Sequence, residues 1–214
     1  MKNPDKISIR RLTTLALFSI AFAYIEAVVV VYLRAIFYPD GFTFPITSFL
    51  EMPGADRYVL IEIGREAATI VLILTASWLM VSTWRKRAAY FLIIFAVWDI
   101  FFYLWLKVLL NWPSSVMDWD ILFLIPLTWA GPVLAPLITS LTMLLTAGLL
   151  LTGKTIKLSL LPAASIVTLV LMIIVLYCLA GRRISQPDYN ACFSWPVFIT
   201  LHLAVLAILF RPAK

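Results

Sequence analysis

Six long apolar stretches follow one another along the chain, separated by short segments rich in proline, glycine and charged residues. A hydrocarbon core ~30 Å thick takes about 20 apolar residues for each helical crossing. We therefore predict six transmembrane helices in a single polytopic domain, residues 1–214. The predicted helices cover about residues 12–37, 58–84, 88–110, 133–151, 158–180 and 195–211.

The apolar stretch at residues 121–151 is too long for one straight crossing and contains Pro126, Gly131, Pro132 and Pro136. Proline inside a helix removes a hydrogen bond and clashes with the preceding turn. This pattern predicts a short outer segment at 121–129, a Pro/Gly break at Gly131-Pro132, and then the fourth helix. Because non-helical backbone at membrane depth needs cover from protein or water, the break is expected to face the interior. The predicted fold class is an all-α integral membrane protein.

The composition supports a membrane protein. The chain of 214 residues is 63% hydrophobic and 13% charged, whereas a soluble domain averages about 25% charged residues. The six stretches leave no room for a separate soluble domain. The net charge of +6 therefore reports membrane topology, and we expect no nucleic-acid partner.

Basic residues gather on one side of the predicted topology. That side holds eleven of the 17 Lys and Arg residues: Lys2, Lys6, Arg10, Arg11, Arg85, Lys86, Arg87, Lys154, Lys157, Arg211 and Lys214. The positive-inside rule makes this side, and both termini, cytoplasmic. The predicted location is the cytoplasmic (inner) membrane, which the chain is expected to cross several times.

The acids are distributed in the opposite way. Ten of the eleven lie from mid-membrane outward: Glu26, Asp40, Glu51, Asp56, Glu62, Glu66, Asp99, Asp118, Asp120 and Asp188. The orientation rule does not require this, because acids contribute little to it. A site that opens to the extracytoplasmic side would explain it.

The second predicted helix carries Glu62, Arg65 and Glu66 within its outer turns. Helical spacing places the two carboxylates one turn apart on one face, with the arginine beside them. Such a pair can share a metal, and an arginine can bind an anionic group of a substrate. The alternative is an internal ion pair that only stabilises the helix.

The sequence Glu62-x-x-x-Glu66 with adjacent Arg65 resembles the Glu-x-x-x-Glu signature of undecaprenyl pyrophosphate phosphatases. The likeness covers five residues, and the Ser/Arg-rich second motif of that family is missing. We assign the chain to no family on this basis.

Three further helices bring ionisable groups to a similar depth. At ~1.5 Å rise per residue, Glu66 and His202 lie ~12 Å below the outer boundary, and Glu26 and Asp99 lie ~16 Å below it. Asp120 falls near the boundary itself. Buried ionisable groups in membrane helices usually face a bundle interior, so we expect a pocket between helices 1, 2, 3 and 6, covered by the segment before helix 4. Each of these residues also has a structural interpretation, as a hydrogen-bonded packing or capping group.

The candidate catalytic residues are Glu62, Arg65, Glu66, Asp99 and His202. The candidate ligands of a divalent metal cation are Glu26, Glu62, Glu66, Asp99, Asp120 and His202. Two cysteines and one histidine exclude an iron–sulfur cluster and bis-histidine haem ligation within this chain.

Three functions remain open. The first is a membrane-embedded enzyme, metal-dependent or acting by acid–base chemistry, on a lipid-linked or amphipathic substrate. The second is a cation- or proton-coupled transporter with Glu26 and Asp99 as carriers, although the inner halves of the helices hold few polar groups. The third is a non-catalytic subunit of a membrane complex. Membrane lipid is the expected partner, and other membrane subunits are expected in the third case.

Overall fold

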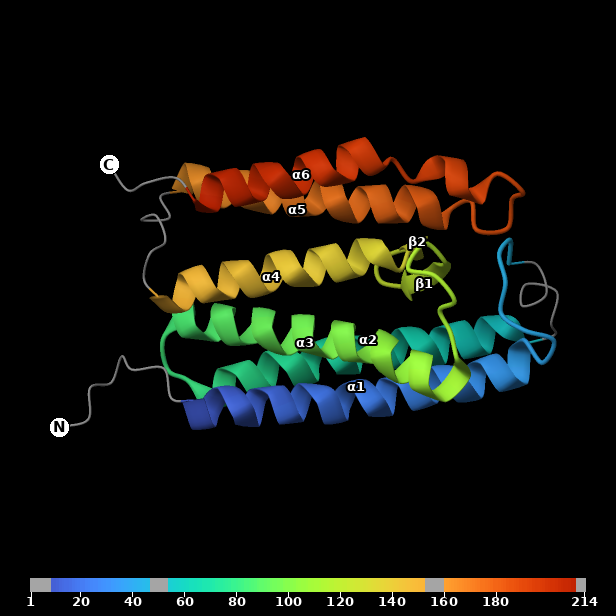
Figure 1. The fold of residues 1–214 in the computed structure, drawn as a ribbon, viewed down its shortest axis with the longest axis horizontal. Helices are drawn as coiled ribbons and strands as arrows, with labels where there is room; N and C mark the ends of the chain where they lie inside the picture. The colour runs from blue at the N-terminus through green and yellow to red at the C-terminus, as the bar shows by residue number, and fades with distance from the viewer. Residues whose placement is uncertain (1–8, 47–53, 153–159, 211–214) are drawn as a thin grey trace.

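A computed structural model describes residues 9–46, 54–152 and 160–210. In these ranges the chain forms six α-helices, one antiparallel hairpin and a short 3-10 turn (Figure 1). The elements in chain order are α1 (Ile9–Phe37), α2 (Ala55–Met80), α3 (Trp84–Leu110), β1 (Trp119–Phe123), β2 (Trp129–Pro132), α4 (Leu134–Thr152), α5 (Leu160–Gly181), η2 (Tyr189–Cys192) and α6 (Trp195–Leu209).

The helix bounds agree with those predicted from the apolar pattern. Each predicted end that falls in the described residues lies within about four residues of the observed end. Helix ends commonly differ by one or two residues between assignment methods, so the largest differences slightly exceed that range. The predicted start of the fifth helix at 158 and the predicted end of the sixth at 211 lie outside the described residues.

Five of the helices in the described ranges are long and apolar enough to cross a membrane: α1, α3, α4, α5 and α6 with the turn before it. This is the architecture of a multi-pass helical membrane protein. α2 is not among the five. It is 26 residues long, and its first half carries Asp56, Arg57, Glu62, Arg65 and Glu66.

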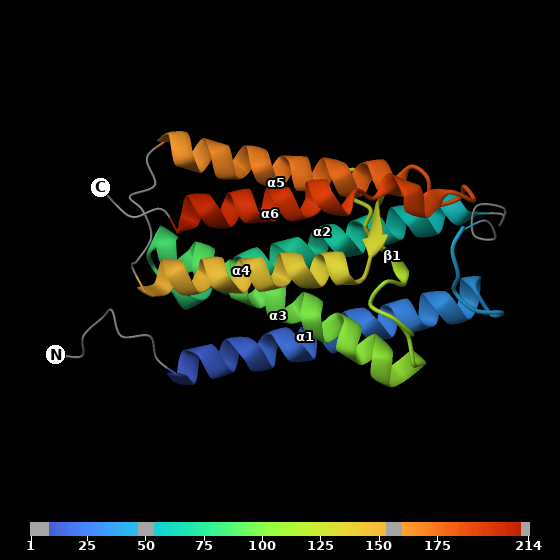
Figure 2. The ribbon, with the colours of Figure 1, turned by 45° about the horizontal axis from the view of Figure 1, so that its top comes forward.

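The helices lie side by side in one bundle (Figures 1 and 2). α3 packs along both α1 and α4 and also contacts α2, whereas α5 pairs with α6. α1 begins and α6 ends at the same end of the bundle (Figure 1). We call this the α1-start end, and we call the opposite end, where α1 stops and α2 begins, the loop end.

The segment before α4 differs from the prediction. It is a β-hairpin, with Trp119 opposite Pro132 and Ile121 opposite Ala130, and Gly131-Pro132 belongs to strand β2. The predicted Pro/Gly break between a short outer segment and the fourth helix is not confirmed, and the described fold is not purely α-helical. Antiparallel pairing gives the backbone polar groups partners within the segment, which a chain interrupted by prolines could not obtain as a helix.

The hairpin is fixed to the second half of the bundle. Strand β2 packs against α5. A side chain at Gly181, the last residue of α5, would overlap the backbone carbonyl of Thr128 in the β1–β2 connection. Only glycine permits this close approach, so the end of α5 holds the hairpin in place.

An apolar core fills the bundle toward the α1-start end. Leu15 of α1, Ile73 of α2, Ile94 of α3 and Ala147 of α4 are completely buried in one cluster. A second cluster joins α4, α5 and α6 around Tyr177 and Phe198. Two buried hydroxyl groups, those of Ser19 in α1 and Ser77 in α2, donate hydrogen bonds to carbonyl oxygens of their own helices.

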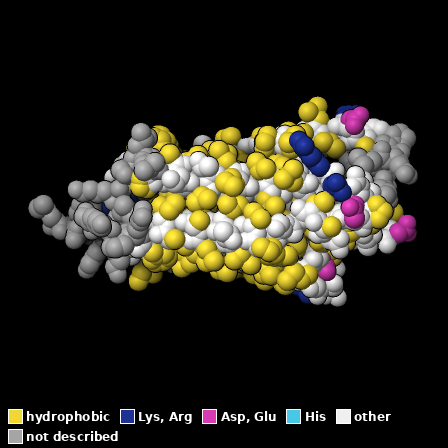
Figure 3. All heavy atoms as spheres, turned by 90° about the horizontal axis from the view of Figure 1, so that it is seen from above, with side chains coloured by type: hydrophobic (Ala, Val, Ile, Leu, Met, Phe, Trp, Pro, Cys, Tyr) yellow, Lys and Arg dark blue, Asp and Glu magenta, His cyan; other side chains and the backbone are white. Residues whose placement is uncertain are grey.

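The outer surface is that of a membrane protein. In Figure 3, hydrophobic side chains cover the length of the bundle, and the visible Lys, Arg, Asp and Glu side chains gather near the loop end. Large apolar residues such as Leu79, Val108 and Leu203 are 60–85% exposed, as expected for a surface that contacts lipid.

Candidate functional site

Two adjoining cavities lie among α1, α2, α3 and the hairpin. The first, which we call the central cavity, has a volume of about 120 Å³ and is also bordered by α4 and by Tyr177 of α5. The second, the side cavity, has a volume of about 160 Å³ and lies toward the loop end of α1 and α2. Both cavities are lined by Val30, Arg65, Glu66, Phe102 and Ile121, which therefore form the wall between them.

The polar side chains of the central cavity lie on helix faces that point toward it. Its ionisable and hydroxyl side chains include Glu26, Arg65, Glu66, Asp99, Thr139 and Ser140. On α3 the lining residues stand at three- and four-residue intervals, which is one face of a helix. The structure thus brings together Glu26, Arg65, Glu66 and Asp99, all of which the sequence singled out.

Arg65 is held between two carboxylates. Its Nη1 forms an ion pair with Glu26 of α1, and its Nε donates to Oε2 of Glu62 over 2.7 Å. Thr69, one turn along α2, donates a second hydrogen bond to Oε1 of Glu26 over 2.8 Å. The Glu26 side chain is 6% exposed and that of Arg65 is 25% exposed. The alternative interpretation of the sequence was an internal ion pair within the second helix. The observed network contains that pair, between Arg65 and Glu62, and extends it to Glu26 of α1.

Glu66 has a different partner. Its Oε2 accepts a hydrogen bond from the backbone N–H of Leu124 over 2.8 Å, in the β1–β2 connection. Glu66 is 7% exposed and lines both cavities. It therefore ties the hairpin to α2 through one oxygen.

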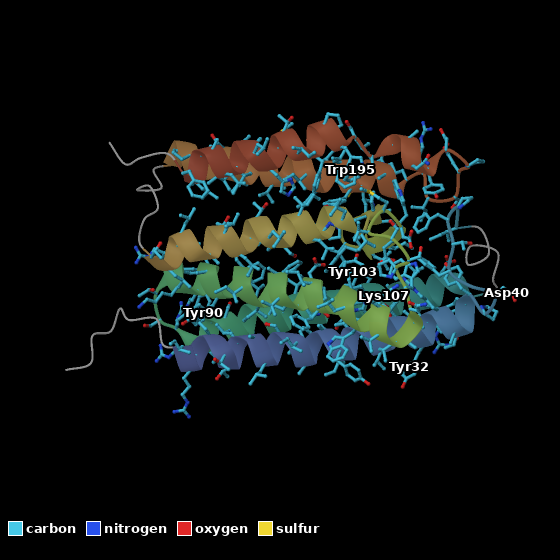
Figure 4. All side chains as sticks on the ribbon, in the orientation of Figure 1. Tyr32, Asp40, Tyr90, Tyr103, Lys107 and Trp195 are labelled. Atoms are coloured by element: carbon cyan, nitrogen blue, oxygen red, sulfur yellow. The ribbon has the colours of Figure 1, made fainter. Side chains whose placement is uncertain are left out.

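Asp99 lines the central cavity on the wall formed by α3. Its Oδ2 accepts a hydrogen bond from the hydroxyl of Ser140 of α4 over 2.8 Å. Tyr103, one turn further along α3, is also on this wall, and Figure 4 shows it in the interior between α3 and α4. Tyr32 of α1 lies at the outer surface in the same view and is 63% exposed.

Asp120 of β1 faces the side cavity and not the central one. Its Oδ1 accepts a hydrogen bond from Nη2 of Arg34 over 3.1 Å, and both side chains are less than 10% exposed. The Arg34 guanidinium stacks on the rings of Trp112 and Phe42, at 3.8 and 4.1 Å from the ring centroids. Arg34 therefore joins the end of α1 to two loops and to the hairpin.

The pKa values of Asp118 and Asp120 are shifted in opposite directions. Burial raises the pKa of Asp120 to about 6, even though the Arg34 guanidinium opposes the shift. Asp118 is closer to solvent, and there the effect of burial is outweighed by hydrogen bonds from Ser114 and Ser115, so its pKa is lowered. Of these two aspartates, the buried one therefore has the raised pKa and the exposed one has the lowered pKa.

His202 does not line the central cavity among the described residues. Its Nε2 lies 3.1 Å from the hydroxyl of Thr139, and its Nδ1 lies 2.9 Å from the carbonyl oxygen of Phe198. Because a carbonyl oxygen only accepts, Nδ1 carries the hydrogen. Thr139 in turn contacts the Tyr177 hydroxyl at 3.2 Å. His202 thus stands one side chain behind the wall formed by Thr139 and Tyr177.

The metal hypothesis receives no support from the donor geometry. Within the described ranges, no three His, Cys, Asp or Glu side chains are grouped closely enough to hold a metal ion. The six predicted ligands are divided among the central cavity, the side cavity and the α4–α6 interior. Metal binding stays a prediction.

Several lining residues were not found by the sequence reasoning. Ser140, Thr139 and Tyr177 lie in apolar helices, and none of the three is among the candidate residues of the sequence. A hydroxyl in such a helix can bond to its own backbone, so its presence alone gives little signal. Trp129 of β2 also lines the central cavity.

The fold is that of a multi-pass helical membrane protein, and its interior holds a cavity lined by several ionisable side chains. Comparisons with protein-family models, with curated proteins and with solved structures gave no match. The function must therefore be argued from the geometry of the cavity.

Proposed function

We propose that this chain is a membrane-embedded enzyme that acts on a lipid-linked or amphipathic substrate in the central cavity. One observation carries the proposal. Glu26, Glu66 and Asp99 come from three different helices and line one interior cavity. Carboxyl groups are expensive to place in a membrane protein, and several that converge on one space indicate a function for that space.

Glu66 and Asp99 are the acid and base of this proposal. Each uses one oxygen in a hydrogen bond that orients the carboxyl group, to Leu124 and to Ser140 respectively. The second oxygen of each is left to exchange a proton with a substrate group. General acid–base catalysis requires carboxyl groups that are oriented in this way and within reach of the substrate.

Arg65, Glu26 and Glu62 have a supporting role. The two carboxylates neutralise the guanidinium and fix it between α1 and α2. The Arg65 side chain therefore positions the wall next to Glu66. Acid–base chemistry is favoured over metal chemistry here because the donor atoms of the described residues are not grouped around a common point.

The membrane topology completes the proposal. We infer that α2 is the sixth crossing, with its charged half turned to the cavities. Arg10, Arg11 and the run Arg85–Arg87 stand at the α1-start end, so both termini are cytoplasmic and the loop end is extracytoplasmic. The site then opens to the extracytoplasmic side of the cytoplasmic membrane, through the side cavity.

The transport hypothesis has less support. A transporter needs a polar path that continues past Glu26 and Asp99, and completely buried apolar residues of four helices occupy that part of the bundle. No specific contact in the described residues favours the non-catalytic subunit over the enzyme.

Lipidomics of membranes from cells that produce the protein tests the proposal. We expect at least one lipid species to be consumed or formed with the wild-type chain, and to be unchanged with Glu66→Gln or Asp99→Asn. Asp188→Asn is the matched control, because Asp188 pairs with Arg183 at an exposed site. Equal lipid profiles for the wild type and both cavity variants, at equal amounts of folded protein, would refute an enzyme of this kind.

A further inference from the structure

The central cavity contains hydrogen-bond donors that the described residues leave without partners. The indole N–H groups of Trp98 and Trp129 are buried and have no acceptor in the described part of the chain. Trp98 is 7% exposed, and both residues line the central cavity. A buried donor without an acceptor costs free energy, so an acceptor brought by a ligand would stabilise this wall.

The same cavity also offers acceptors. Glu66 and Asp99 each accept one hydrogen bond through one oxygen in the described structure, and a carboxyl group has capacity for more. The hydroxyl of Tyr177 and that of Thr139 can both donate and accept. A ligand that fits this lining must therefore donate and accept in the same small volume.

The lining disfavours anions and ammonium groups for two different reasons. Arg65 is the cation on this wall among the described residues, and Glu26 and Glu62 already neutralise it. An anionic group would stand next to Glu66 and Asp99 with no free cation. An ammonium group has only donors, so it would leave both indole N–H groups unpaired.

Aromatic rings make up the rest of the wall. Trp129 stacks on Tyr177 with a centroid distance of 5.9 Å and an interplanar angle of 4°, and Phe123 packs against Trp129. On α3, the rings of Trp98 and Phe102 also pack together, with a centroid distance of 6.2 Å. The face of an aromatic ring is electron-rich and attracts the polarised C–H bonds of a ring that carries hydroxyl groups.

We propose that the central cavity binds a neutral polyhydroxylated group, such as the sugar of a glycolipid or of a lipid-linked saccharide. Each hydroxyl both donates and accepts, so it can satisfy an indole N–H and a carboxyl oxygen together. This inference rests on the proposed function, because it names the substrate class of the same site.

A binding experiment with three amphiphiles of equal chain length tests the inference. The full chain is purified without any sugar-based detergent and placed in lipid nanodiscs. Thermal unfolding is then followed with n-octyl-β-D-glucoside, octyltrimethylammonium or octyl phosphate below their micellar concentrations. We expect a saturable increase in melting temperature with the glucoside and none with the two charged amphiphiles. An equal or larger increase with either charged amphiphile, or no increase with the glucoside, would overturn the proposal.

Two conservative variants locate the binding. Trp98→Phe and Trp129→Phe keep an aromatic ring but remove the N–H, and we expect each to weaken glucoside binding about threefold to tenfold. Trp84→Phe is the control, because Trp84 is 72% exposed at the α1-start end of α3. Equal weakening by all three variants, or by none, would contradict a site in the central cavity.

The outcomes separate this inference from the proposed function. Glucoside binding without any lipid turnover would refute the enzyme and keep the sugar site. Turnover of a lipid that carries no sugar would keep the enzyme and refute the sugar site.

Discussion

The backbone N–H of Leu124 donates a hydrogen bond to Oε2 of Glu66 over 2.8 Å. This contact joins the β1–β2 connection to α2, and the two residues are 58 positions apart in sequence. It places the hairpin over the wall that divides the central cavity from the side cavity. One acid therefore has a structural partner and a place in the candidate active site.

Glu66→Leu removes the acceptor of this hydrogen bond, and Glu66→Gln keeps an acceptor oxygen. We expect Glu66→Leu to increase hydrogen exchange at the Leu124 amide, because a buried N–H that loses its partner costs about 1–3 kcal/mol. Glu66→Gln should leave exchange close to that of the wild type. Hydrogen–deuterium exchange of the peptide that contains residues 121–129 makes the measurement. Equal protection in Glu66→Leu would show that this contact does not hold the hairpin.

Arg65→Leu leaves Glu26 and Glu62 without their cation. We expect a loss of about 3–5 kcal/mol in unfolding free energy, because breaking a buried ion pair leaves an uncompensated charge. Glu26→Gln in the Arg65→Leu background should recover part of the loss. Unfolding by SDS in mixed micelles measures both variants. The control is Arg183→Ala, whose ion pair with Asp188 is about half exposed and should contribute less than about 1 kcal/mol.

Gly181→Ala tests the contact between α5 and the hairpin. The added Cβ would overlap the carbonyl of Thr128, so we expect destabilisation of about 1–3 kcal/mol. Gly148→Ala is the matched control, because a Cβ at this position in α4 meets no atom within 4 Å. Alanine should be neutral or stabilising there by about 0.5–1 kcal/mol, since glycine is unfavourable inside a helix. A Gly181→Ala protein as stable as the wild type would contradict the close packing of the hairpin.

We expect the free energy of unfolding to depend on pH through Asp120, which lines the side cavity. Its pKa rises from 3.8 to about 6 on folding, so the folded chain holds this proton at a pH where the unfolded chain has lost it. The contribution of Asp120 to stability is therefore full below about pH 4, falls as the pH rises toward 6, and is constant above that. The unfolding free energy of the wild type relative to Asp120→Asn should fall over this interval. A relative stability that rises with pH would mean that Arg34 dominates over burial.

The histidine tautomer is a direct test of the α4–α6 contacts. The chain has a single His, so the ¹⁵N resonances of the imidazole need no assignment. We expect the hydrogen on Nδ1, donated to the Phe198 carbonyl, and an Nε2 that accepts from Thr139. Thr139→Val should shift the Nε2 resonance and leave Nδ1 protonated. A resonance pattern with the hydrogen on Nε2 would contradict this geometry.

Sequence reasoning gave helix positions close to those observed, and four of its candidate residues line one cavity. Runs of apolar residues determine where membrane helices lie, because length and hydropathy are local properties. The grouping of Glu26, Arg65, Glu66 and Asp99 followed from the cost of isolated charges in lipid. The cost of isolated charges explains why ionisable side chains gather, but it does not say which positions they take. It therefore included His202 in the predicted pocket, whereas Thr139 and Tyr177 line the central cavity there.

The hairpin could not be obtained in the same way. Residues 121–129 are apolar and interrupted by Pro126, which excludes a regular helix but does not choose between a loop and a strand pair. The register of Asp120 opposite Gly131 depends on packing against α5. Long-range contacts of this kind, including Arg34 with Asp120, leave no local signal in the sequence.

An experimental density map of the wild-type chain, purified in nanodiscs with native lipids and without sugar-based detergent, tests the central claim most directly. Our account predicts density for a bound molecule in the central cavity, in contact with Glu66, Asp99 and Trp98. Protein side chains that fill this space, or carboxyl groups of Glu66 and Asp99 that point away from each other into separate surroundings, would contradict it.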